Sequence, residues 1–131
     1  MDPAVSPAVH VTGLDHLVLN VADTERSLAF YLGELGLSPV RVDEWRRGEV
    51  FFASVRLADT TIIDLLDVAP DGRNVDHLCL VIEEQDLQEL ADSGRFDVMD
   101  DPDQRFGAQG DGTSLYVRDP DGNVVELIGR A

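Results

Sequence analysis

The feature that most constrains the fold of this chain is an internal repeat. The motif DHLxL occurs at residues 15–19 and again at residues 76–80. An acid inside an aliphatic run also occurs twice, as IIDL at residues 62–65 and as VVEL at residues 124–127. Nearly the same number of positions separates the two histidines and the two acids, so the halves of the chain are expected to share one structure.

Each half has the pattern of a β-α-β-β-β module. In the first half we expect a strand over 14–20, a helix that begins at Asp23 or Thr24 and ends at Gly36, and strands over 38–44, 50–57 and 61–66. In the second half we expect a strand over 75–82, a helix over 84–92, and strands over 95–99, 113–118 and 123–128. The polar connection 100–112 is long enough to indicate a functional or mobile loop.

These elements predict an α+β domain over residues 13–131, with modules at about 13–69 and 74–130. Residues 1–12 contain two prolines and no clear period, which is typical of a flexible N-terminal arm. A chain of 131 residues is long enough for one hydrophobic core and too short for two independent domains.

Charge and composition exclude several function classes. The chain has 26 acidic and 10 basic residues, a net charge of −16, which opposes binding to nucleic acid or anionic membranes. All basic residues are arginines, so lysine chemistry is excluded. A single cysteine, Cys79, excludes an internal disulfide. The N-terminus has no signal-peptide pattern and no apolar run is long enough to span a bilayer, so we predict a cytoplasmic protein.

Four polar side chains are expected on otherwise apolar strands: His16, Asp64, His77 and Glu126. A carboxylate buried alone is unfavourable, and a divalent cation would neutralise it. Imidazole with carboxylate suits Zn, Fe, Mn, Co or Ni better than Ca or Mg. Each residue alone is explained as well by a hydrogen-bonded core position, and Asp64 by an outward-facing acid near a turn. Their joint recurrence in the repeat favours a site for one divalent transition metal.

Three segments resemble the vicinal oxygen chelate superfamily, which includes glyoxalase I, extradiol dioxygenases, and the fosfomycin- and bleomycin-resistance proteins. They are LDHLVLNVADTERSLAFYLGELGL, VDHLCL and YVRDPDGNVVEL, and the resemblance covers about residues 13–129. It implies paired βαβββ modules whose curved mixed sheets close around a metal site. It also implies that the ligands come from the first and fourth strands of each module, here His16, Asp64, His77 and Glu126.

The resemblance also implies roles for the site residues. Glu126 would be a ligand that also shuttles a proton, and Asp64 is a weaker candidate for that role. Asp64 stands where glyoxalases have a longer ligand, so it would bind directly, bind through water, or leave a triad of His16, His77 and Glu126. Apart from the resemblance, Tyr116 and Arg118 are candidates for substrate binding, with core packing as the alternative for Tyr116 and a surface charge as the alternative for Arg118.

We therefore expect a glyoxalase-like, metal-dependent enzyme of the lyase or isomerase type, which chelates neighbouring oxygens of a small substrate. The alternative is a protein that sequesters a drug or metabolite, as bleomycin-resistance proteins do. A ring-cleaving dioxygenase is disfavoured, because Gly107-Ala108-Gln109 lies where that branch has a histidine. Exposed strand edges predict a homodimer. A site within one chain and a site shared between two chains are both compatible with the sequence.

Overall fold

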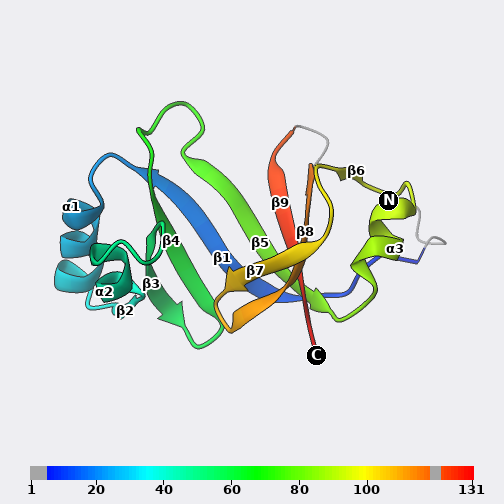
Figure 1. The fold of residues 1–131 in the computed structure, drawn as a ribbon, viewed down its shortest axis with the longest axis horizontal. Coiled ribbons are helices and arrows are strands. Elements are labelled where there is room, and N and C mark those ends of the chain that lie inside the picture. Colours follow the sequence, from blue (N-terminus) through cyan, green and yellow to red (C-terminus); the bar gives the residue numbers. More distant parts are fainter. Residues whose placement is uncertain (1–5, 119–121) are drawn as a thin grey trace.

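The computed structural model describes residues 6–118 and 122–131, which form a single curved mixed sheet flanked by short helices (Figure 1). The first module contains β1 (Val11–Val21), α1 (Thr24–Leu28), the π-helical η1 (Ala29–Glu34), β2 (Ser38–Val40), α2 (Val42–Arg46), β3 (Ala53–Ala58) and β4 (Thr61–Asp67). The second contains β5 (Val75–Glu83), α3 (Leu87–Asp92), β6 (Asp97–Val98), β7 (Asp103–Gly107), β8 (Gly110–Arg118) and β9 (Val124–Arg130). The expected α+β class with two modules is confirmed.

Two expectations about the elements were wrong. The segment expected as one strand over 38–44 leaves the sheet after Val40 and forms α2 instead. Acids at Asp43 and Glu44 in its first turn and Arg46 in its last turn stabilise this helix through the helix dipole. The segment 100–112, expected as a loop, contains β7, which pairs with β8 in a hairpin.

The order of strands in the sheet is β2-β3-β4-β1-β5-β9-β8-β6, with β7 also paired to β8. In each module the last long strand lies parallel to the first, β4 beside β1 and β9 beside β5. The modules join because β1 pairs with β5 in antiparallel fashion. The four strands that carry the repeated histidines and acids are therefore the four central strands, within one chain.

Each module has its own apolar core on the helical side of the sheet. Leu65 of β4 belongs to a cluster with Leu28 and Val42, next to α1 and α2. Leu127 of β9 belongs to a cluster with Leu87 and Leu90 of α3. Because successive side chains of a strand point to opposite faces, the acids that precede these two leucines point to the other face of the sheet.

The N-terminal end of the described part contacts the second module. The backbone N–H of Glu83 donates to the carbonyl of His10, and Ala8 and Val9 pack against the core beside α3. Residues 1–5 and part of the DPDGN segment, residues 119–121, lie outside the described residues, so the flexible arm over 1–12 stays a prediction. Within the described part, no helix is long and apolar enough to cross a membrane.

Candidate metal centre

Both repeated histidines directly follow a β-bulge. In the β1–β5 pairing, a register shift before His16 leaves Asp15 as an extra residue in β1. A second shift before His77 leaves Asp76 as an extra residue in β5. A bulge bends its strand and redirects side chains, so the aspartate no longer points away from the histidine that follows it. The repeated Asp-His pair is thus a repeated local structure.

Each bulged aspartate fixes the tautomer of its histidine. Nδ1 of His16 lies 2.7 Å from Oδ1 of Asp15, and Nδ1 of His77 lies 2.8 Å from Oδ2 of Asp76. A carboxylate only accepts hydrogen bonds, so Nδ1–H donates in both pairs and each Nε2 is left to face the site. Asp15 is fully buried and also accepts from the backbone N–H of Ala108, whereas the side chain of Asp76 is 46% exposed.

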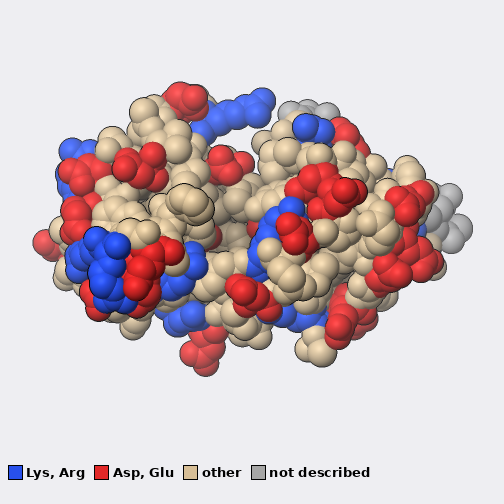
Figure 2. Space-filling view, viewed as in Figure 1, with Lys and Arg blue, Asp and Glu red and all other residues tan. Residues whose placement is uncertain are grey.

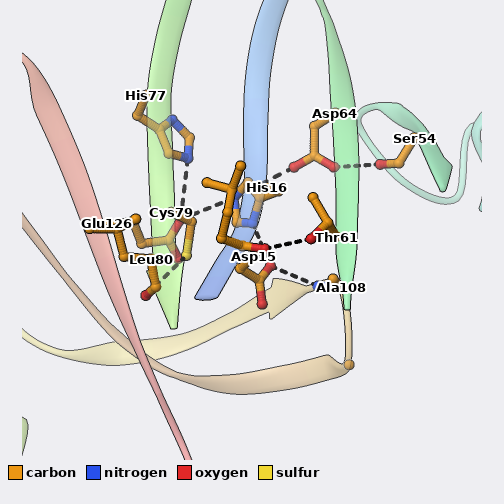
Figure 3. A network of polar contacts seen from close by, with 12 residues as sticks. Asp15, His16, Ser54, Thr61, Asp64, His77, Cys79, Leu80, Ala108 and Glu126 are labelled. Carbon is orange, nitrogen blue, oxygen red and sulfur yellow. Dashed lines mark hydrogen bonds and ion pairs between the residues drawn. The ribbon is translucent and has the colours of Figure 1, made fainter. Parts of the chain in front are cut away.

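The second nitrogen of each imidazole, Nε2, points to one shared carboxylate (Figure 3). Nε2 of His16 and Nε2 of His77 each lie 3.2 Å from Oε1 of Glu126. The ligand atoms of the three residues lie within 4.8 Å of one another. Glu126 is buried, and its Oε2 has no hydrogen-bond partner among the described residues. Two imidazoles and a carboxylate with an unpaired oxygen fit a divalent transition ion.

Asp64 of β4 points toward the same ligand atoms, but it lies further from Nε2 of His16 than Glu126 does. Its Oδ2 lies 3.7 Å from Nε2 of His16, and its Oδ1 accepts a hydrogen bond of 2.6 Å from the hydroxyl of Ser54. The side chain is buried, so Ser54 holds one oxygen while the other is directed to the histidine. This arrangement is compatible both with a direct ligand and with one that acts through water.

The metal-free centre is strongly charged. Burial would raise the pKa of Glu126, but hydrogen bonds with His16 and His77 outweigh it and hold that pKa well below its usual range. Burial would lower the pKa of both histidines, but the acids around them raise it. For Asp64 burial is the largest effect and raises the pKa. An incoming cation therefore replaces protons on the two imidazoles.

The centre forms one wall of a cavity of about 420 Å³, which is in the size range of small-molecule sites. Figure 2 shows a hollow between the two lobes of the molecule, with acidic side chains spread over both lobes. Phenylalanines and Tyr116 form much of the remaining lining. Two arginines, Arg41 and Arg105, also line this cavity.

The structure separates the two expected substrate-binding residues. The hydroxyl of Tyr116 lies 3.4 Å from Nε2 of His77, and its ring lies in the cavity lining. Arg118 is further along β8, at 3.5 Å from Asp97, and is not part of that lining. Cys79 is fully buried next to His16, and burial raises its pKa to about 12, which describes a packed thiol rather than a nucleophile.

Sequence reasoning missed several residues around the centre. The strand alternation placed Asp15 and Asp76 on the face opposite to the histidines, and only the bulges bring them back. The signal was present, because an aspartate precedes the histidine in both copies of the motif. Arg41, Arg105 and Ser54 have no such signal.

Comparison with known proteins agrees with this fold. The family model of the Glyoxalase/Bleomycin resistance protein/Dioxygenase superfamily matches residues 13–127. The chain belongs to this superfamily.

Among curated proteins, the chain is 31% identical to a virulence protein of Salmonella typhimurium, over 87% of this chain and 81% of that protein. It is 33% identical to a glyoxalase domain-containing protein of Mycosarcoma maydis, over 89% of this chain and 68% of that protein. It is 29% identical to a probable lactoylglutathione lyase of Synechocystis, over 86% of this chain and 92% of that protein.

A solved structure, methylmalonyl-CoA epimerase from Mycobacterium tuberculosis, has the same fold. The TM-score is 0.64, with 19% identity over 98% of this chain and 94% of the epimerase.

Proposed function

We propose that this protein is a metal-dependent enzyme of the glyoxalase-like, lyase or isomerase type. The observation that carries the proposal is the convergence of two tautomer-fixed imidazole nitrogens and one buried carboxylate on the wall of a small cavity. The relative named as a probable lactoylglutathione lyase supports the same class of reaction.

His16, His77 and Glu126 would hold one divalent ion of Zn, Ni, Co, Mn or Fe, with Asp64 as the fourth group. Such an ion, when bound, acts as a Lewis acid on two neighbouring oxygens of the substrate. The chain itself contributes the position of these groups, because the bulged aspartates fix both imidazole rings.

The proton transfer would be carried out by the buried carboxylates. In the isomerisation of an α-hydroxycarbonyl compound, a carboxylate takes the proton from the hydroxyl-bearing carbon next to the carbonyl, and the electron pair of that bond moves toward the carbonyl oxygen. The same carboxylate then returns the proton to the former carbonyl carbon, and the proton of the hydroxyl moves to the oxygen on that carbon, so no oxidant or reductant is needed. Glu126 is our candidate for this role, and Asp64, held by Ser54, faces the same space.

The metal site is tested by reconstitution and elemental analysis. We expect one ion per chain in the wild type and a loss of both stoichiometry and affinity in His77→Ala. The matched control is His10→Ala, because His10 is exposed and lies outside the cavity lining. Full stoichiometry and affinity in His77→Ala would disprove the assignment. Asp64→Ala should weaken binding less than Glu126→Ala, because Asp64 stands further back.

The aromatic lining of the cavity favours a second candidate, a protein that sequesters an aromatic drug or metabolite without turnover. To distinguish the enzyme from the sequestering protein, the metal-loaded protein is incubated in D₂O with the hemithioacetal of methylglyoxal and glutathione, and with other small α-hydroxycarbonyl compounds. Deuterium exchange or product formation that is lost in Glu126→Gln supports the enzyme. Saturable binding without exchange supports the sequestering protein.

A further inference from the structure

Arg41 is the most unusual residue of the cavity. It is the one non-glycine residue with a positive φ in the described part of the chain, at φ 57° and ψ 25°. An L-residue adopts this left-handed conformation at a cost in free energy, and such residues gather at functional sites. The conformation lies at the junction of β2 and α2 and places the side chain in the cavity lining.

The guanidinium of Arg41 makes no hydrogen bond and no ion pair with the described residues, although its charge acts on Asp64 and opposes the rise that burial causes in the pKa of that carboxyl. The other half-buried arginines make such bonds: Arg56 and Arg130 donate to backbone carbonyls, and Arg105 contacts Asp100 at 2.7 Å and also Ser114. Nε of Arg41 is buried and makes no hydrogen bond. Although the chain has 26 acidic residues, none of those that the structure describes forms an ion pair with this arginine of the cavity.

Two aromatic rings hold Arg41 in place. Its guanidinium carbon lies 3.8 Å from the ring centre of Phe106 and 4.9 Å from that of Phe52. Phe52 belongs to the first module and Phe106 to the second, so the contact spans the cavity between the modules. A guanidinium with an aromatic ring against its face keeps the N–H groups of its edge for a ligand, and that edge matches the paired oxygens of a carboxylate or phosphate.

We propose that Arg41 binds an oxyanion substituent, carboxylate or phosphate, on the substrate whose neighbouring oxygens the metal centre chelates. The substrate class is therefore a small anionic compound in which the oxyanion is separate from the chelating oxygens. This inference rests on the proposed function for the chelating end only. Among the described residues, no hydrogen bond, ion pair or ring contact joins Arg41 and its two phenylalanines to His16, His77 or Glu126, although the charge of Arg41 opposes the rise in the pKa of Asp64.

Two matched pairs of probes test the oxyanion. 2-Oxoglutarate and 2-oxovalerate differ in a distal carboxylate, and dihydroxyacetone phosphate and dihydroxyacetone differ in a phosphate. Binding is measured by calorimetry on wild-type protein with and without added Zn²⁺. We expect at least one probe with the distal oxyanion to bind about tenfold or more tightly than the partner that lacks it. The pair that shows the preference identifies the oxyanion.

Arg41→Met should abolish this preference, and Arg41→Lys should keep part of it, because lysine retains the charge without the planar edge. The control Arg26→Met removes the same charge from an exposed arginine of α1 and should keep the preference unchanged. Unchanged metal stoichiometry in Arg41→Met would show that the variant is folded at the centre.

No preference for either probe with the distal oxyanion in the wild type would overturn the inference, as would an undiminished preference in Arg41→Met. Failure of the proposed function would be recognised differently, because the wild type would then not bind Zn²⁺. An Arg41-dependent preference in the metal-free protein would still support the oxyanion site.

Discussion

Asp15–His16 and Asp76–His77 are the same motif in two environments, and the difference has a measurable consequence. Asp15 is buried, accepts from the N–H of Ala108 and lies 3.6 Å from Arg130, whereas Asp76 is partly exposed to water. A carboxylate that is itself held in place orients its histidine more strictly than one that moves in solvent. The two histidines are therefore expected to depend on their aspartates to different extents.

We predict that Asp15→Asn lowers metal affinity by roughly 10- to 100-fold, the range for lost partners of metal-binding histidines. Asp76→Asn, the same change on the other strand, should lower it less. Affinity is measured by competition with a chromophoric chelator, and thermal unfolding of the metal-free variants serves as the control for folding. An equal or larger loss in Asp76→Asn would contradict the argument.

At the residue scale, the repeat indicated which polar side chains share a purpose, and the family resemblance indicated where they meet. The alternation along the strands and the recurrence of His16, His77, Asp64 and Glu126 could be inferred from the sequence, whereas the use of the first and fourth strands of each module was implied by the resemblance. The structure places these strands side by side. The contacts of Arg41 could not be inferred, because its left-handed backbone lies inside a segment that looks like a continuous strand. Backbone exceptions of this kind depend on tertiary contacts, which a periodic pattern does not contain.

The β7–β8 hairpin contacts the metal centre through Asp15. Ala108, the first residue of its loop, donates its N–H to Asp15, and Gly107 allows the close approach. A Cβ on Gly107 would lie 2.9 Å from Oδ1 of Asp15 and 2.8 Å from Nη2 of Arg130. The long Arg130 side chain can move, but the short, buried Asp15 cannot move without disturbing His16.

We predict that Gly107→Ala lowers the free energy of unfolding by about 1–3 kcal/mol, as for other overpacked sites, and also weakens metal binding. The matched control is Gly13→Ala in β1, where an added Cβ meets nothing within 4 Å. Urea unfolding of the metal-free proteins gives the stability, and chelator competition gives the affinity. If Gly107→Ala behaves like the control in both measurements, the hairpin does not support the centre.

The hairpin and α2 are the two elements that the repeat did not predict. Both are insertions into the shared βαβββ pattern, α2 between β2 and β3 and β7 before β8. Each brings one member of the Arg41–Phe106 contact into the cavity, Arg41 immediately before α2 and Phe106 on β7. A repeat predicts what two halves have in common, so the parts that distinguish them had to come from the structure.

For the whole molecule we predict a homodimer. β2 at one end of the sheet pairs only with β3 among the described strands, and such an edge is normally covered. The net charge of −16 opposes association, so salt should strengthen the dimer by screening. Light scattering at micromolar concentration in low and moderate salt measures this. A monomer at moderate salt would refute the prediction.

The pairing of β1 with β5 makes a further prediction about how the centre is assembled. His16 and His77 lie together because their strands are neighbours in one chain, and β4 and β9 of that chain supply both acids. Chains with His16→Ala and chains with His77→Ala each lack one ligand, so refolding them together should restore no metal binding, even if they dimerise. Wild-type protein taken through the same unfolding and refolding is the control. Recovery of about a quarter or more of the wild-type metal content in the mixture would show instead that the modules of two chains exchange, because only a shared centre can take His16 from one chain and His77 from the other.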